Sequence, residues 1–282
     1  MSLSESTYKY LAEVMGTFLL LFFGDMSIAV SLMGDTNTRL FQIVMGWFFG
    51  VFIAIYTIGG ISGAHINPAV TIALWFGKRF PKKDVLPYIV SQLIGAFLGG
   101  MFTYIFWSGM WSIYDPNFTK WSWSQILHCH YPNPAMFPDA YPAAEGGNAA
   151  TLSDALKWGN AHWPLWLGFL IEFVMTALLL FTIVAAGDPD SPLGAGKWAG
   201  AIIALYVGFA CFITPMTMTC MNPARDTGPR FITLLLGYGH ISLPGYRWEW
   251  PVIYVIPQIL GGIAGVYLWD YIFKPYFKLV KK

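Results

Sequence analysis

The tripeptide Asn-Pro-Ala lies within apolar sequence at two places in this chain, as Asn67-Pro68-Ala69 and as Asn222-Pro223-Ala224. Asparagine is a preferred residue immediately before a helix, and proline is favoured at the first helical position. Each tripeptide therefore predicts a helix whose free N–H groups and positive dipole end lie beside an asparagine amide. Two such ends, if they meet, would donate hydrogen bonds to an oxygen-bearing neutral solute and disfavour cations and protons.

Two ionisable residues lie next to these tripeptides. Arg225 directly follows the second one; inside a pore a guanidinium repels cations and offers several donors to solute hydroxyls. The alternative, a surface arginine at the end of a loop, conflicts with the apolar sequence around it. His65 precedes the first tripeptide and is either a pore-lining contributor, through its carbonyl or imidazole, or a satisfied core histidine.

The apolar runs contain no nucleophile with a partner and no zinc motif such as His-Glu-x-x-His, so an enzyme is not expected. The run His128-Cys129-His130 has two imidazoles but no carboxylate or further cysteine beside them, which favours a surface turn over a metal clip. Cys129, Cys211 and Cys220 form no CxxC pair, and we expect no disulfide framework. We therefore expect no metal and no cofactor.

The composition is that of a membrane protein. Hydrophobic residues make up 56% and charged residues 11% of the 282 residues, against roughly 25% charged in soluble domains. The net charge of +1 indicates no nucleic-acid partner. The first apolar run is too long for the core of a signal peptide and is expected to remain as a span. Apolar runs of spanning length fall at about 10–32, 42–59, 85–107, 164–186, 198–214 and 250–273.

Basic residues in short loops predict the orientation, since such loops are cytoplasmic. With six spans, both termini then lie on the cytoplasmic side of the cell membrane, and the segment of about 108–163 forms a long external loop. The basic residues are Lys78, Arg79, Lys82 and Lys83 before the third span, and Lys274, Lys278, Lys281 and Lys282 after the sixth.

An internal repeat predicts the architecture. The segment beginning at Glu13 returns at Glu172 with the same threonine, three leucines and phenylalanine, and Gln92 returns at Gln258. Each repeat holds three spans, an odd number, so the second is inverted in the bilayer. We expect a single all-α membrane domain over 1–282, with repeat one at about 8–107 and repeat two at about 164–273.

The segments around the two tripeptides are apolar but too short to cross a bilayer, so each is predicted to enter and return as a half-helix. Non-helical backbone at that depth is tolerated only where protein buries it or where it lines a water-filled cavity. The alternative, an Asn-Pro pair that only caps a loop helix, suits one copy but not two at equivalent places. Two opposed half-helices therefore predict a lined cavity near the midplane.

Three acids fall within or near apolar runs. Glu13 and Glu172 are repeat-related, and we expect them to accept hydrogen bonds from backbone N–H groups of the re-entrant loops. Asp25 has no counterpart in the second repeat. Such acids also occur in proton-coupled secondary transporters. Against that alternative stand Arg225, the half-helix dipoles and the lack of a carboxylate and histidine chain along the spans.

Together, the segments 62–71 and 221–226 and the paired glutamates resemble the major intrinsic protein family of aquaporins and glycerol facilitators, over nearly the whole chain. The resemblance implies passive conduction through a pore in every subunit of a homotetramer. It also implies an outer constriction formed by Trp47, Ala210, Thr219 and Arg225. Residue type alone suggests instead that Trp47 is a lipid-interface anchor.

Asp226, Arg230 and Pro257 resemble the glycerol-conducting branch of the family. An apolar wall at Trp47 opposite hydrogen-bonding groups suits glycerol or a similar polyol, with some water. Thr219 departs from the phenylalanine typical of that branch, and Ala210 from its glycine. The alternatives are therefore a water-selective channel, or a channel for urea, metalloid acids, hydrogen peroxide or a short hydroxy acid.

Overall fold

The computed structural model describes residues 3–33, 39–118, 121–131, 163–191, 194–245 and 247–280. Within these residues the secondary structure is helical, without strands, and six helical stretches are long and apolar enough to cross a membrane. The expectation of an all-α chain with six spans is thereby confirmed. Their helices are α1 (Glu5–Met33), α2 (Arg39–Ser62), α4 (Lys82–Tyr114), α7 (Leu165–Ala186), α8 (Ala199–Ile213), and α10 (Glu249–Tyr254) continued by α11 (Ile256–Leu268).

The two repeats have the same internal packing, with the first helix of each laid against the last. In repeat one α1 packs on α4, and in repeat two α7 packs on α11. A methyl group added at Gly95 would overlap the Val14 carbonyl, and one added at Gly261 would overlap the Phe173 carbonyl. Glycines therefore bring the two backbones into contact, as is common between helices in lipid.

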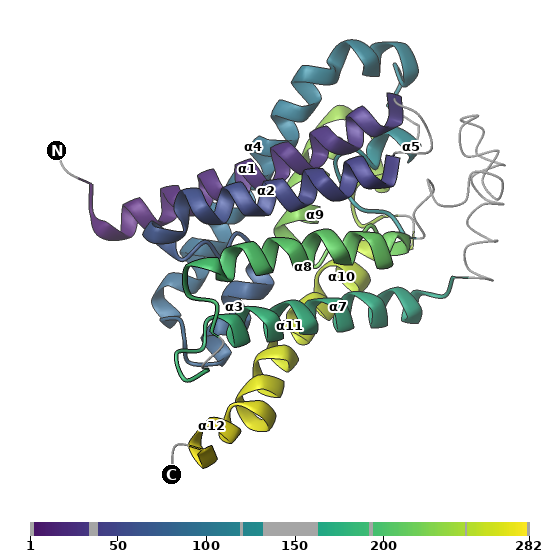
Figure 1. The fold of residues 1–282 in the computed structure, drawn as a ribbon. Coiled ribbons are helices and arrows are strands. Elements are labelled where there is room, and N and C mark those ends of the chain that lie inside the picture. Colours follow the sequence, from purple (N-terminus) through teal and green to yellow (C-terminus); the bar gives the residue numbers. More distant parts are fainter. Residues whose placement is uncertain are drawn as a thin grey trace.

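Two shorter helices complete the repeats without spanning, namely α3 (Pro68–Phe76) and α9 (Pro223–Leu236). Helix α3 packs against α11, and α9 packs against α4, so each half-helix is held by the last helix of the other repeat. In Figure 1, α3 lies toward the end of the bundle that carries both chain termini, and α9 lies toward α5 (Trp121–Ser124). This is the expected pair of opposed half-helices.

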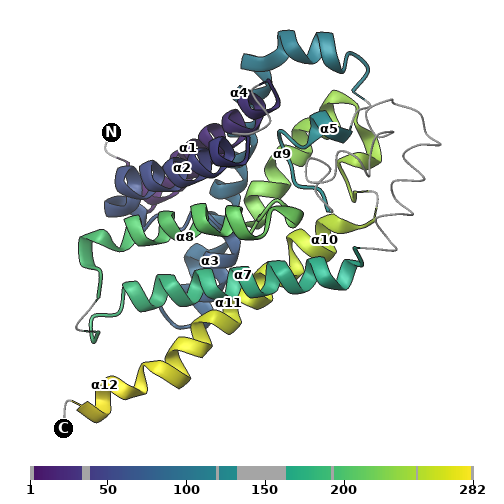
Figure 2. The same ribbon diagram turned by 45° about the vertical axis from the view of Figure 1, so that its right-hand side comes forward.

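The beginning of α1 and the final helix α12 (Pro275–Val280) lie at the same end of the bundle, opposite to α5 (Figures 1 and 2). At this end of the bundle, basic residues noted in the sequence form ion pairs with acidic residues of other segments. Arg79 contacts Asp270 at 2.5 Å, and the ammonium of Lys274 lies 3.0 Å from a carboxylate oxygen of Asp188. Lys281 and Lys282 lie outside the described residues.

The sixth span is not one continuous helix. It breaks at Val255, where φ is −128° and ψ is −63°, and α11 starts with Pro257 in its first turn. Proline is tolerated there because the first N–H groups of a helix have no partner within it. After Leu268 the chain continues through a π-helical turn over Trp269–Phe273.

The expected external loop starts later than predicted, because α4 continues to Tyr114. After α5 the chain does not stay at the surface: residues 125–131, which we call the strap, run into the protein. His128, Cys129 and His130 are each 0% exposed, so the interpretation of these residues as a surface turn is wrong. Residues 132–162 of the expected loop lie outside the described residues.

Candidate conducting pore

The two Asn-Pro-Ala segments meet and bind one another. Each asparagine caps its own half-helix: Asn67 Oδ1 accepts from the N–H of Ala69 at 2.8 Å, and Asn222 caps α9 in the same way. Asn67 Nδ2 donates to the carbonyl of Met221 at 2.8 Å, and Asn222 Nδ2 donates to that of Ile66 at 2.9 Å. Since an amide nitrogen carries two hydrogens, each keeps one for a further acceptor.

The backbone before each asparagine is left-handed at two equivalent positions. In the first loop φ is 50° at Ala64 and 44° at Ile66; in the second it is 46° at Thr219 and 49° at Met221. A non-glycine residue pays about 1–2 kcal/mol for this conformation, so surrounding contacts must stabilise it. The shared pattern shows that both loops follow the same path.

The buried carboxylate of Glu13 binds the first loop. Its two oxygens accept from the N–H groups of His65 at 3.0 Å and Ile66 at 2.8 Å. They also accept from the Ser62 hydroxyl and from the Gln92 amide. These bonds satisfy backbone donors that no helix or sheet would satisfy at this depth.

Glu172 repeats the arrangement in the second loop. Its oxygens accept from the N–H groups of Cys220 at 3.0 Å and Met221 at 2.8 Å, and from the amide of Gln258 at 2.8 Å. The glutamate and glutamine pairs detected in the sequence repeat are thus the groups that stabilise the two strained loops.

A cavity of about 160 Å³ runs between the helices beside the meeting point of the two loops. Its wall is largely apolar, with leucine, isoleucine and valine side chains from α1, α2, α7 and α8. Among the residues singled out in the sequence, the lining includes Trp47, His65, Asn67, Thr219, Asn222 and Arg225.

Arg225 provides the charge in this cavity. Its guanidinium carbon lies 4.5 Å from the centre of the Trp47 ring, and Nη1 donates to the carbonyl of Leu127 at 3.1 Å. Nη2 has no hydrogen-bond partner within the part of the chain that the structure describes, which leaves donors for a solute. Trp47 is 6% exposed, so the alternative role of a lipid-interface anchor is wrong.

The hydroxyl of Thr219 is bound to backbone carbonyls and is therefore not free to bind a solute in the cavity. Oγ1 lies 2.8 Å from the carbonyl of Thr214 and 3.3 Å from that of Ala210. The hydroxyl therefore binds the end of α8, and Thr219 adds little bulk to the wall. Ala210 is 1% exposed and does not line the cavity; its neighbour Cys211 does.

His65 lines the opposite part of the cavity. Its Nδ1 lies 3.1 Å from the Thr71 hydroxyl, and its ring centre is 4.5 Å from Phe80 and 5.1 Å from Tyr88. The imidazole is therefore held by packing and a hydrogen bond, as a positioned part of the wall.

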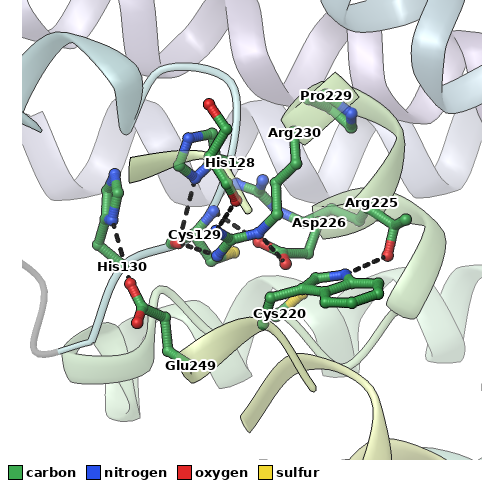
Figure 3. A network of polar contacts seen from close by, with 12 residues as sticks. His128, Cys129, His130, Cys220, Arg225, Asp226, Pro229, Arg230 and Glu249 are labelled. Carbon is green, nitrogen blue, oxygen red and sulfur yellow. Dashed lines mark hydrogen bonds and ion pairs between the residues drawn. The ribbon is translucent and has the colours of Figure 1, made fainter. Parts of the chain in front are cut away.

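Asp226 and Arg230 lie behind the cavity, where they bind the strap (Figure 3). Asp226 pairs with Arg230 and accepts from the N–H of Cys129 at 2.8 Å. Arg230 donates to the carbonyls of Cys129 at 2.7 Å and Ser242 at 2.6 Å. Because the strap supplies the Leu127 carbonyl to Arg225, these residues position the pore arginine without touching the cavity. Sequence reasoning missed Leu127, since it acts through its main chain.

The two histidines of the strap are neutral at pH 7. Burial, together with the nearby positive charge of Arg230, lowers the pKa of His128 and of His130 well below the usual value. His130 Nδ1 lies 3.9 Å from a carboxylate oxygen of Glu249. In the described ranges, no three or more His, Cys, Asp or Glu side chains are grouped so that they could hold a metal ion.

Asp25 is the acid without a repeat partner. It is 0% exposed, and neither carboxylate oxygen has a hydrogen-bond partner among the residues described. Counting along the repeat from Glu13 and Glu172, the equivalent position holds Val184. The buried carboxyl group is therefore a feature of the first repeat alone.

Comparison with known proteins gives a consistent result. The family described as Major intrinsic protein matches residues 1–269. The propanediol uptake facilitator PduF of Salmonella typhimurium is 33% identical over 265 residues, which cover 92% of this chain and 91% of that protein. The glycerol uptake facilitator protein of Haemophilus influenzae is 32% identical over 268 residues, covering 92% and 91%.

The fold also has a close match among solved structures. The X-ray structure of the aquaglyceroporin from Plasmodium falciparum superposes with a TM-score of 0.79, covering 97% of this chain and 99% of that one. The sequence identity is 22%, so this match speaks for the fold, with its half-helices and inverted repeat.

Proposed function

The chain belongs to the major intrinsic protein family, and we propose that it forms a passive transmembrane channel for glycerol and other short polyols, with some water. One observation carries the proposal: Arg225 and the two asparagine amides present spare N–H donors to a cavity whose lining is otherwise largely apolar. A polyol has carbons on one face and hydroxyls on the other, which matches such a wall.

The names of two relatives support this class of solute. One is a propanediol uptake facilitator and the other a glycerol uptake facilitator, each matched over more than nine-tenths of its length. Propanediol and glycerol both carry hydroxyls on a three-carbon chain. A wall with little bulk at Thr219 leaves space for either solute.

The geometry supports a role for each site residue within this proposal. Trp47, Thr219 and Arg225 form the outer filter, with Cys211 in the place expected for Ala210. Asn67 and Asn222 bind the solute where the half-helices meet, and His65 completes the wall. Glu13 and Glu172 hold the loops. Asp226 and Arg230 hold the strap, while Pro257 lies in the first turn of the helix that packs on the first half-helix.

The protein is an integral multi-pass membrane protein, and we further propose its setting. The whole chain is one channel domain in the cell membrane, with both termini in the cytoplasm and the strap at the outer side. Loop charges near Arg79 and Lys274 support that orientation. Four copies assemble, each with its own pore. The mass of the complex released in mild detergent tests the tetramer, and a monomeric mass would refute it.

Stopped-flow light scattering on proteoliposomes tests the function. Glycerol and propane-1,2-diol influx should exceed that of empty vesicles, without any proton gradient. The fluxes of urea, lactic acid and water are measured in the same vesicles. Fast water flux without polyol entry would show a water-selective channel. Selective entry of urea or lactic acid would show that this compound, and not a polyol, is the solute.

A proton-coupled transporter gives a different result in the same vesicles. It would accumulate solute against its gradient when a pH difference is imposed, whereas a channel only equilibrates it. The half-helix dipoles and the Arg225 charge oppose a proton path through this cavity. Uphill accumulation would therefore refute the channel.

A further inference from the structure

Two thiols from distant parts of the chain meet at the outer side of the pore. Cys129 lies in the strap, and Cys220 lies in the second re-entrant loop, two residues before Asn222. Both are free and buried, and both belong to one packed cluster of buried side chains with Tyr131, Ile253 and Tyr254. Figure 3 shows them within one network around Arg230.

Neighbouring contacts hold both cysteines in place. The N–H and carbonyl of Cys129 are bound by Asp226 at 2.8 Å and Arg230 at 2.7 Å. The N–H of Cys220 is bound by Glu172 at 3.0 Å. The Cys220 thiol donates to the carbonyl of Asn222 at 3.3 Å. Anchored backbones on both sides thus hold the two cysteines in one packed cluster.

Only one of the two thiols is open to a solute. Cys220 lines the cavity, whereas Cys129 does not and is 0% exposed. A small neutral oxidant in the cavity therefore meets Cys220 first and finds Cys129 behind it. This is the arrangement of an attacked cysteine with a resolving cysteine beside it.

We propose that Cys129 and Cys220 form an oxidant-driven disulfide that ties the strap to the second re-entrant loop. The oxidant class is a hydroperoxide, with hydrogen peroxide as the smallest member. The Cys220 thiol attacks one peroxide oxygen, the O–O bond breaks, and water leaves as Cys220 becomes a sulfenic acid. The Cys129 thiol then attacks that sulfur, and a second water carries away the hydroxyl group and the thiol proton.

The outer side of a membrane is where such a bond persists, since reducing systems keep cytosolic thiols reduced. The link joins the segment whose Leu127 carbonyl accepts a hydrogen bond from Arg225 with the loop that carries Thr219. The disulfide thus covalently links the two segments that contribute to the outer filter. The inference needs peroxide to reach the cavity but does not depend on polyol conduction, so the two proposals fail independently.

Peptide mapping of the full chain in proteoliposomes tests the proposal. The protein is treated with hydrogen peroxide, free thiols are blocked with N-ethylmaleimide in denaturant, and the digest is analysed by mass spectrometry without reduction. We expect a Cys129–Cys220 crosslinked peptide that dithiothreitol removes. Cys129→Ser and Cys220→Ser should lack it, and Cys211→Ser, which removes the other cavity-lining thiol, should retain it.

The unfolding midpoint in detergent gives a second measurement. Oxidation should raise it in the wild type and in Cys211→Ser, because a crosslink restricts the unfolded chain, but not in Cys129→Ser. Wild-type protein that shows no Cys129–Cys220 peptide after peroxide treatment would overturn the proposal. So would a crosslink to Cys211, or Cys220 oxidised to sulfinic acid beside a free Cys129. The wild-type result decides the matter even where a serine variant fails to fold.

Discussion

We expect the small side chain of Thr219 to set the width of the proposed outer filter. Its hydroxyl is bound to the end of α8 at Thr214, so the residue contributes a small apolar surface to the cavity. The opposite wall is the Trp47 ring under the Arg225 guanidinium. A side chain that replaces Thr219 therefore changes the space beside the spare donors of Arg225.

Thr219→Phe should narrow the filter and lower the ratio of polyol to water permeability several-fold, because an aromatic ring would fill space that threonine leaves open. The two fluxes are measured by stopped-flow light scattering on the same vesicles. Thr219→Val is the matched control: it keeps the volume and loses only a hydroxyl that already faces α8, so its ratio should stay near the wild-type value. An unchanged ratio in the phenylalanine variant would mean that the constriction lies elsewhere.

At the scale of elements, the two re-entrant loops depend on buried carboxylates that cross from the first helix of each repeat. Both loops store backbone strain at equivalent positions, and both are bound through two consecutive N–H groups. The acids are therefore structural groups that act on the pore through the loop backbone.

Glu172→Gln should lower stability by about 1–3 kcal/mol, because one oxygen acceptor becomes an NH2 group that faces a backbone N–H. Glu13→Gln should have a similar effect, since its contacts repeat those of Glu172. Chemical unfolding in detergent measures both. If one variant is destabilised and the other is not, the two loops are not held equivalently.

A second contact between elements joins the strap to α9. It depends on Asp226 and Arg230, which are both fully buried. Asp226→Asn leaves the Arg230 charge buried without its partner, which costs about 3–5 kcal/mol in comparable buried pairs. We also expect altered solute selectivity, because the strap carries the Leu127 carbonyl that holds Arg225.

Glu5→Gln is the matched control for that variant, because Glu5 and Lys9 are also an i,i+4 pair but lie exposed on α1. It should leave the unfolding midpoint and the solute ratio unchanged, as exposed pairs contribute little. Wild-type stability in Asp226→Asn would show that the strap is held by other contacts.

At the scale of the whole molecule, the half that holds the strap has a built-in sensitivity to acid. His128 and His130 are neutral in the folded protein because burial lowers their pKa values well below the usual range. Below pH of about 6.5, the ordinary histidine value, the unfolded chain binds protons that the folded chain does not. Stability therefore falls as the pH drops from about 6.5 toward the lowered folded-state values, at about 1.4 kcal/mol per pH unit for each histidine.

His128→Asn should reduce the loss of stability between pH 8 and pH 5, because one group that resists protonation in the folded state is removed. Thermal unfolding in detergent at the two pH values measures the loss. His240→Asn, which removes an exposed histidine, is the control and should retain the wild-type difference. An equal loss in wild type and His128→Asn would show that His128 is protonated in the folded protein.

The sequence by itself determined the architecture, for reasons that are local or periodic. Six apolar runs of spanning length predict six helices, and an odd number of spans in each repeat makes the second copy inverted. Asn67-Pro68 and Asn222-Pro223 are capping signals, so they predict where α3 and α9 begin. The repeated glutamates and glutamines indicated which side chains bind the re-entrant loops.

Only the tertiary structure decided what surrounds the filter. The strap approaches Arg225 through a main-chain carbonyl, and any residue type carries a carbonyl, so no sequence pattern could have indicated Leu127. Likewise, whether Ala210 or Cys211 faces the cavity depends on the rotation of α8, which packing against α2 and α7 fixes. Cys129 and Cys220 lie far apart in the chain, and only folding brings them into one packed cluster.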